Sequence, residues 1–260
     1  MTGPASLTVP EYPNNVIELS GVTKVFGTGR NELVALTNID LDVAQGEIVC
    51  LVGTSGCGKT TILNLVAGLD RPSDGTVATR GRPALMFQEA ALFPWLTVSA
   101  NVELPMRLAG VGKAERRQRA AELLDTVHLT GFGKRLPHQL SGGMRQRVAM
   151  ARAFAQEADL LLMDEPFGAL DAMTRDSLHD ELETLTRHRG VTVLFVTHNV
   201  REAARLGDRI VVLSPRPGRV KATFEVDIAH PRRIESPEVS GLAGRVTEQL
   251  RQEALVHARS

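Results

Sequence analysis

Hydrophobic residues occur along the chain in two arrangements, compact runs and regularly spaced positions. Near the N-terminus, residues 16–19 and 39–43 alternate between apolar and polar side chains, which is typical of half-buried strands. The Gly-containing loop at 27–31 would join them as an antiparallel pair. Later runs are almost entirely apolar, as strands covered on both faces are. These runs span residues 48–52, 84–87, 160–164, 192–196 and 210–213.

Helical spacing replaces this pattern between residues 90 and 157, which predicts an inserted helical subdomain. Its basic stretch, residues 113–119, is expected to be the solvated face of a helix. The side chains expected on the buried face of that helix are those of Ala120, Ala121, Leu124 and Val127. In the same subdomain, the large apolar residues at 92–96 either fill its core or form a surface for a partner protein.

The two ends of the chain differ in character. Residues 1–15 are rich in Pro, Thr and Asn and lack the basic and apolar regions of a signal peptide, so they predict a flexible tail. Residues 226–260 form an extension whose apolar positions recur at helical spacing, which predicts one amphipathic helix. These positions are Val239, Leu242, Val246, Leu250 and Leu255. The main domain is expected to span residues 16–225.

Composition argues against several classes of protein. The 260 residues include 30 basic and 30 acidic side chains, so no net positive charge supports a nucleic-acid partner. No run approaches the roughly 20 apolar residues that span a bilayer, so work at a membrane would need a membrane-spanning partner chain. Cys50 and Cys57 offer no disulfide framework or paired metal ligands, and they fit a reducing, cytosolic setting.

Residues 53–61 match the phosphate-loop pattern G-x-x-x-x-G-K-[ST]. They follow the apolar run at 48–52 and lead into a helix, which is the context that this motif requires. The glycines let successive N–H groups and a helix N-terminus face phosphate, while Lys59 would reach the outer phosphates and Thr60 would bind Mg²⁺. The expected nucleotide-binding residues of this loop are Gly53, Thr54, Ser55, Gly56, Cys57, Gly58, Lys59, Thr60 and Thr61.

Cys57 lies two residues before Lys59 and close to the predicted helix N-terminus. Both features are typical of reactive cysteines, so the loop predicts an exposed thiol that lines the nucleotide site. The alternative is a small side chain that merely fits a tight turn. Cys50, in contrast, is expected to be buried in its strand and inert.

Polar side chains follow two of the apolar runs, at the strand ends where parallel α/β sheets place their chemistry. Asp164 and Glu165 end one run. The first carboxylate is suited to a divalent metal and the second to orienting or deprotonating a water molecule. His198 ends another run in the same way, and we interpret it as functional rather than structural.

Ser141, Gly142 and Gly143 directly precede a predicted helix and form a second helix N-terminus suited to an anion. This stretch, the phosphate loop, the Asp-Glu strand end and His198 occur in the order and approximate spacing of ATP-binding-cassette (ABC) ATPases, which the chain resembles over residues 16–225. The resemblance implies an α/β fold with a P-loop NTPase, RecA-like core of mainly parallel sheet. It also implies an N-terminal antiparallel β subdomain and the inserted α-helical subdomain.

The same resemblance implies how nucleotide and metal would be held. Phe26 would stack on the adenine of ATP, and Lys59 would contact phosphate. Thr60, Gln88 and Asp164 would surround Mg²⁺.

The resemblance also implies roles in catalysis and in assembly for the remaining matched residues. Glu165 would be the general base, and His198 would contact the γ-phosphate. Asp171 resembles a residue of the loop that communicates across the dimer. Residues 141–143 would contact the γ-phosphate bound by the opposite subunit, so the active unit would be a head-to-tail pair enclosing two ATP.

Two stretches resemble one branch of the family. Residues 164–171 are similar to bacterial importers, and residues 88–102 are similar to subunits that serve nitrate, sulfonate and taurine uptake. The implied protein is peripheral at the cytoplasmic face of the membrane. Its partners would be a second copy of itself, an integral membrane permease and, indirectly, an extracytoplasmic solute-binding protein, with no nucleic acid. The alternative is an ABC-type ATPase of DNA repair, although the long coiled coils or zinc modules of those cassettes do not occur here.

Overall fold

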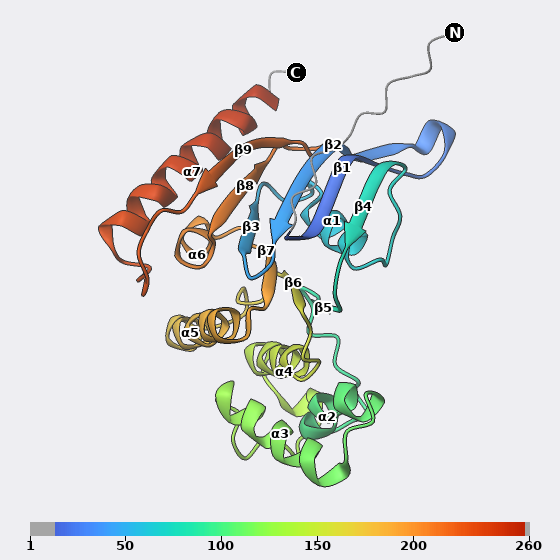
Figure 1. The fold of residues 1–260 in the computed structure, drawn as a ribbon, viewed down its shortest axis with the longest axis vertical. Helices are drawn as coiled ribbons and strands as arrows, with labels where there is room; N and C mark the ends of the chain where they lie inside the picture. Colours follow the sequence, from blue (N-terminus) through green and yellow to red (C-terminus); the bar gives the residue numbers. More distant parts are fainter. Residues whose placement is uncertain (1–13, 258–260) are drawn as a thin grey trace.

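Two β-sheets organise the chain, which the computed structural model describes over residues 14–257. The smaller sheet is antiparallel and has the order β2-β1-β4 (Figure 1). Its strands are β1 (Asn15–Phe26), β2 (Leu33–Ala44) and β4 (Asp74–Thr79). The predicted antiparallel pair is confirmed, and both strands extend beyond the predicted runs. Of the predicted tail, residues 1–13 lie outside the described part, whereas Asn15 is already buried in β1.

The larger sheet has the strand order β5-β6-β7-β3-β8-β9. Neighbouring strands are parallel except for β8 and β9, which are antiparallel. The strands are β3 (Ile48–Val52), β5 (Pro83–Met86), β6 (Leu160–Asp164), β7 (Thr192–Val196), β8 (Arg209–Leu213) and β9 (Val220–Glu225). Because parallel neighbours end at one edge of a sheet, the residues that follow β3, β6 and β7 meet there.

Helices surround the larger sheet and extend the molecule at one end. The group α2, α3 and α4 lies at the end away from the antiparallel sheet, and α7 lies beside α6 and β8 (Figure 1). The helices are α1 (Lys59–Val66), α2 (Val98–Leu108), α3 (Lys113–Thr126), α4 (Gly142–Phe154), α5 (Ala172–Arg189), α6 (Val200–Leu206) and α7 (Pro237–His257). Two short 3₁₀ helices are Gly29–Asn31 and Pro137–Gln139.

Strand β3 separates two hydrophobic cores, because successive side chains of a strand point to opposite faces. Cys50 and Val52 belong to the cluster that includes residues of α2 to α7. Val49 and Leu51 belong to the cluster formed with α1 and the antiparallel sheet. Both faces of the strand are therefore covered, which explains why the run is apolar at every position.

Two predicted core positions point to solvent instead. Ala121 on α3 is exposed, whereas Ala120 beside it is buried, because neighbouring helix positions differ by about 100° around the axis. Leu255 on α7 is also exposed, as is Ala254, so the buried stripe of that helix ends near Leu250. The predicted amphipathic helix itself is confirmed.

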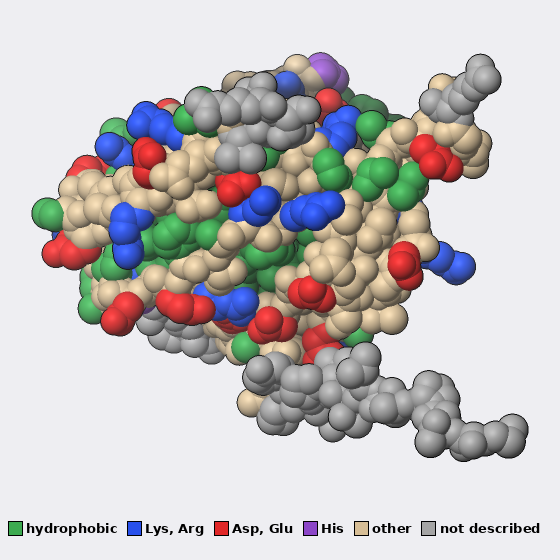
Figure 2. All heavy atoms as spheres, turned by 90° about the horizontal axis from the view of Figure 1, so that it is seen from above, with side chains coloured by type: hydrophobic (Ala, Val, Ile, Leu, Met, Phe, Trp, Pro, Cys, Tyr) green, Lys and Arg blue, Asp and Glu red, His purple; other side chains and the backbone are tan. Residues whose placement is uncertain are grey.

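Surface charge follows the balanced composition. On the face shown in Figure 2, basic and acidic side chains are interspersed. This distribution agrees with the net charge of zero and gives that face no field of one sign to attract a polyanion.

Candidate active site

The phosphate loop joins β3 to α1 through glycines that a larger residue would not replace. Gly58 has φ 103° and caps α1 in a left-handed conformation, and a Cβ there would collide with Leu36 of β2. Helix α1 begins at the next residue, Lys59, whose side chain is buried. Its Nζ donates hydrogen bonds to the carbonyl oxygens of Gly53 at 2.8 Å and Thr54 at 3.1 Å. The lysine is thus held against the loop at the start of the helix.

Thr60 and Asp164 form the inner part of the site. The Thr60 hydroxyl donates to Asp164 Oδ2 at 2.6 Å, across the gap between α1 and the end of β6. Asp164 is buried, and this burial raises the pKa of its carboxyl, while the Thr60 hydrogen bond and the charge of Lys59 oppose the shift. A buried carboxylate beside a hydroxyl is an oxygen donor set of the kind that hard divalent cations prefer.

Glu165 lies at the centre of the outer part of the site. Its φ of 47° turns the chain sharply after β6, and its N–H donates to the carbonyl of Val196 at the end of β7. Its Oε2 lies 3.2 Å from His198 Nδ1 and 3.4 Å from Gln88 Nε2. The His198 side chain is 68% exposed, so the imidazole faces open space beside the carboxylate. Gln88 after β5 and His198 after β7 therefore converge on the carboxylate that follows β6.

A pocket of about 230 Å³ connects these two parts. Phe26 forms part of its wall at the end of β1, with Lys24 Nζ 4.9 Å from the centre of the aromatic ring. Predicted residues that line the pocket are Phe26, Ser55, Gly56, Gly58, Lys59, Thr60, Thr61, Gln88, Asp164 and Glu165. The structure thus brings together most of the residues that the sequence predicts for nucleotide and metal.

Arg216 lines the same pocket and was missed by sequence reasoning. It lies in the turn after β8, and its Nε donates to the carbonyl of Gly56 at 3.3 Å. The turn could be recognised from its Pro and Gly residues, but its proximity to the phosphate loop follows only from β8 lying next to β3. Arg216 adds a cation beside the loop that is expected to hold phosphate.

Cys57 corrects one prediction, because its thiol is not exposed. The side chain is fully buried in the core cluster around α1, and it does not line the pocket. Its N–H donates to the carbonyl of Thr54, which closes the turn. The side chain therefore fills space beneath the loop, as the alternative of a small residue in a tight turn states. Cys50 is buried as predicted, and burial raises the pKa of its thiol.

Residues 141–143 lie apart from the pocket that Lys59 lines. Ser141 caps α4, and its Oγ accepts a hydrogen bond from the N–H of Met144 at 3.3 Å. Gly143 packs so closely on the loop before α5 that a Cβ would lie 2.9 Å from the carbonyl oxygen of Ala169. In that loop Asp171 caps α5, and hydrogen bonds from Thr174 lower the pKa of its carboxyl. One molecule alone does not bring Ser141 to its own phosphate loop.

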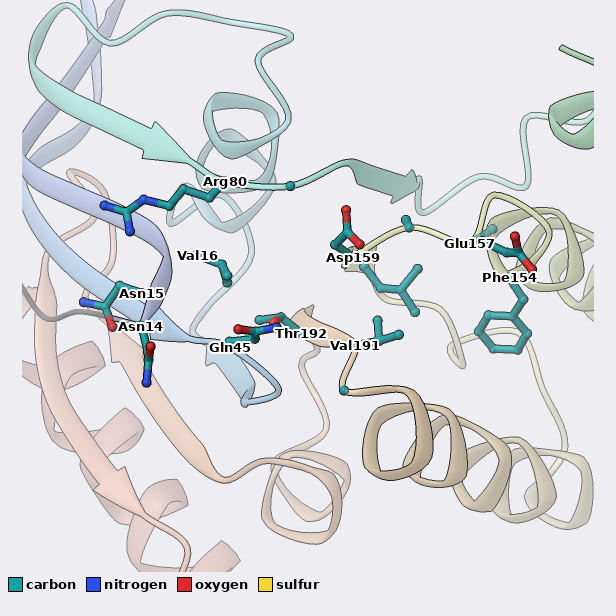
Figure 3. A pocket seen from close by; sticks show the side chains of 15 residues that line it. Asn14, Asn15, Val16, Gln45, Arg80, Phe154, Glu157, Asp159, Val191 and Thr192 are labelled. Atoms are coloured by element: carbon teal, nitrogen blue, oxygen red, sulfur yellow. The ribbon is translucent and has the colours of Figure 1, made fainter. Parts of the chain in front are cut away.

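A larger cavity, of about 660 Å³, lies elsewhere (Figure 3). It adjoins the opposite ends of β6 and β7, where Asp159 and Thr192 line it together with Asn15 and Arg80 of the antiparallel sheet region. None of the predicted site residues lines this cavity. Size alone therefore does not locate the chemistry of this molecule.

Two kinds of feature do not occur within residues 14–257. Among these residues no group of three or more His, Cys, Asp or Glu side chains is arranged to hold a metal ion. None of the described helices combines the length and the apolar character needed to cross a bilayer.

The chain is similar to known proteins in both sequence and fold. The sequence model of a family described as ABC transporter matches residues 36–168, which include the phosphate loop, residues 141–143 and Asp164. The chain belongs to the ABC transporter family. Its ATPase activity follows from that membership, and the fold class predicted from the sequence is confirmed.

Relatives of this ABC ATPase are similar over most of its length. An aliphatic sulfonates import ATP-binding protein of Burkholderia ambifaria is 45% identical, covering 92% of this chain and 73% of the relative. A nitrate import ATP-binding protein of Synechocystis sp. is 41% identical over 85% of this chain and 86% of the relative. A taurine import ATP-binding protein of Burkholderia pseudomallei is 44% identical over 80% and 83%.

Solved structures of ABC cassettes have the same architecture. One is a dimeric ATP-binding cassette in a post-hydrolysis state bound to ADP and Pi, with a TM-score of 0.76 and 35% identity to this chain. The match covers 82% of this chain and all of that cassette.

Proposed function

We propose that this ABC ATPase is the ATP-binding subunit of an importer and hydrolyses MgATP to drive solute uptake through a separate permease. The observation that carries the proposal is Glu165, which lies between His198 and Gln88 beside the phosphate-loop pocket. Membership of the ABC transporter family and the import proteins among its relatives support the direction of transport. A role in DNA repair has no such support.

The pocket suits MgATP in its shape and its donors. Phe26, with a half-exposed ring at one side, would stack on adenine, and the loop from Gly53 to Thr61 would surround the phosphates. The buried Asp164 carboxylate, the Thr60 hydroxyl and the nearby Gln88 amide fit Mg²⁺, which prefers oxygen ligands. The bound ion would neutralise charge that develops on the phosphate oxygens.

Hydrolysis would be carried out by the outer part of the site. Glu165 would accept a proton from a water molecule as the water oxygen attacks the γ-phosphorus. The bond to the β–γ bridging oxygen then breaks, and ADP and inorganic phosphate leave. His198, 3.2 Å from the same carboxylate, would hold the γ-phosphate in line with that water.

The geometry also supports a dimer with shared sites. Ser141 lies outside the pocket of its own chain, on an exposed helix N-terminus. A head-to-tail partner would bring the N-terminus of its α4 to the open side of the pocket, where the partial positive charge of the helix end suits a γ-phosphate. Asp171, in the loop that packs on Gly143, would lie at the same interface.

The proposed setting is the cytoplasmic face of the membrane, with the ATPase as a peripheral subunit. Its partners would be a second copy of the chain, an integral membrane permease and, indirectly, an extracytoplasmic solute-binding protein. Names of the relatives point to nitrate, a sulfonate or taurine as the class of solute, all small anions or zwitterions.

The test is the replacement Glu165→Gln, which keeps the size of the side chain but removes the base. MgATP should still bind, measured with a fluorescent ATP analogue, while steady-state hydrolysis falls about 100-fold or more. Glu122→Gln makes the same chemical change on the exposed surface of α3 and should leave turnover unchanged. Near-normal turnover of Glu165→Gln would remove Glu165 from this role.

A further inference from the structure

Glu202 lies beneath the loop that carries His198. It is on α6 and is only 5% exposed, yet it carries a carboxylate. Its Oε2 accepts a hydrogen bond of 2.8 Å from the hydroxyl of Thr197, the residue before His198. The same hydroxyl accepts the N–H of Asn199, and the Asn199 side chain caps α6. The position of His198 is therefore set from both sides by contacts that end on α6.

Arg175 connects this carboxylate to a different loop. It lies in the first turn of α5, and its Nη2 donates to the carbonyl of Leu170 at 2.8 Å. Its Nε lies 3.5 Å from Glu202 Oε1. One guanidinium thus contacts both the loop that ends at Asp171 and the residue that supports the His198 loop.

The two loops also enclose a common space. A cavity of about 50 Å³ is lined by Arg175 and Glu202 and also by Glu165 and His198. A change in the Arg175–Glu202 contact would therefore alter the wall of the space next to the proposed base.

We propose that Arg175 and Glu202 are positioning residues that couple the loop at 168–171 to His198. This inference rests on the proposed catalytic roles of Glu165 and His198. When a partner molecule engages the 168–171 loop, Arg175 transmits the position of that loop to Glu202, and Thr197 transmits it to His198. Hydrolysis then depends on dimer assembly through a connection inside each chain, in addition to the residues that cross the interface.

The electrostatics of the pair make the connection sensitive to loss of either partner. Burial raises the pKa of Glu202, whereas the Thr197 hydrogen bond and the charge of Arg175 favour the ionised carboxylate. Removing Arg175 leaves the buried Glu202 carboxylate without its cation. The carboxylate then takes up a proton or draws in water. Either outcome changes the acceptor on which Thr197 depends.

The experiment compares Arg175→Ala, Glu202→Gln and the double variant with the control Arg205→Ala. Arg205 also joins α6 to α5, through Asp176 at 2.8 Å and Asp180 at 2.6 Å, but none of these contacts reaches either loop. Arg175→Lys is included because it keeps the charge, although one ammonium group does not replace the fork of a guanidinium. Each full-length protein is assayed for kcat, KM for MgATP and melting temperature, with His198→Ala alongside.

We expect Arg175→Ala and Glu202→Gln each to lower kcat about 10-fold or more, with KM for MgATP within about 2-fold of wild type. The double variant should lose no more than the larger single loss, because the two residues act through one connection. Arg175→Lys should recover kcat only in part. Arg205→Ala should lower the melting temperature and keep kcat within about 2-fold of wild type.

Other results would overturn the coupling. If Arg175→Ala and Arg205→Ala lower kcat equally, Arg175 only joins two helices. Additive losses in the double variant would show that the two residues do not act through one connection. An effect on KM alone would show that the pair does not act on the hydrolysis step. Where Arg175→Ala does not fold, Glu202→Gln with unchanged kcat decides against the proposal. If His198→Ala is inactive, any of these results overturns only the coupling. If His198→Ala remains active, the same results overturn the proposed function as well as the coupling.

Discussion

His179 shows at the scale of one residue how burial sets a response to pH. It is fully buried on α5, with its ring edge-on to Phe167 at 4.4 Å between ring centres and Nδ1 3.1 Å from Arg205 Nη1. Burial lowers the pKa of His179 to about 3 from an ordinary 6.5, and the charges of Arg205 and Arg175 add to the shift. The carboxylate of Asp176, 3.9 Å away, is not sufficient to reverse it.

This shift predicts a loss of stability in acid. The unfolded chain takes up a proton on this imidazole near pH 6.5, but the folded chain does so only near pH 3, so stability falls as pH falls through that interval. At the acid end of this interval, protonation of this group lowers the free energy of unfolding by on the order of 3–5 kcal/mol. His179→Gln, which stays neutral, should show a smaller fall in melting temperature between pH 7 and pH 4.

The control for that measurement is His138→Gln, which replaces an exposed imidazole. It should follow the wild-type dependence of melting temperature on pH. A His179→Gln profile that runs parallel to wild type would show that His179 is not the group that titrates.

Individual residues of the site differ in how well the sequence predicts them. Asp164, Glu165 and His198 were predictable because they follow apolar runs, and parallel strands bring such positions to one edge. The burial of Cys57 was not predictable from the sequence, because a loop motif specifies backbone turns but not the face on which one side chain packs. Arg216 was missed because its place beside the loop depends on strand order.

At the scale of an element, the segment before α2 presents two aromatic rings on a fixed backbone. Asn101 of α2 is fully buried, and its amide bonds the backbone of Phe93, Leu96 and Thr97. Trp95 lies in the middle of this segment with 73% of its surface exposed, and its ring centre is 5.6 Å from that of Phe93. An anchored but exposed indole favours a partner surface over the core of the subdomain.

We therefore expect Trp95→Ala to uncouple hydrolysis from transport. Basal ATP hydrolysis by the isolated subunit should change less than about 2-fold, whereas stimulation by the reconstituted permease should fall about 10-fold or more. Leu108→Ala is the matched control, because Leu108 is a 79% exposed apolar residue of the same subdomain, at the other end of α2. An equal loss of basal and stimulated activity in Trp95→Ala would indicate a role in folding.

Elements were predictable where their hydrophobic pattern is strong. The apolar runs correspond to strands, and the period of α7 indicated a helix. Helix α5 was not predicted, because among its described positions only a narrow stripe, with Leu178 and Leu182, faces the core. Strand order was also beyond the sequence, since nothing local places β3 between β7 and β8.

At the scale of the whole molecule, the two helix ends that we propose for anion binding lie in different places. Lys59 begins α1 in the phosphate-loop pocket, and Ser141 caps α4 outside that pocket. Helices α1 and α4 lie in separate parts of the molecule, so in the proposed dimer a second molecule would supply the end that the pocket lacks (Figure 1). The sequence contains both motifs, and the fold keeps them apart within one chain.

Mixing two inactive variants tests this account most directly. Lys59→Ala would remove the proposed phosphate contact from its own chain, and Ser141→Arg would block the helix end that we propose is offered to the partner. In a mixed head-to-tail dimer both defects fall in one site, and the other site is intact. A one-to-one mixture should therefore recover up to about a quarter of wild-type hydrolysis, since about half of the dimers are mixed and each has one working site. No recovery, with mixed dimers shown to form by native mass spectrometry, would contradict shared sites.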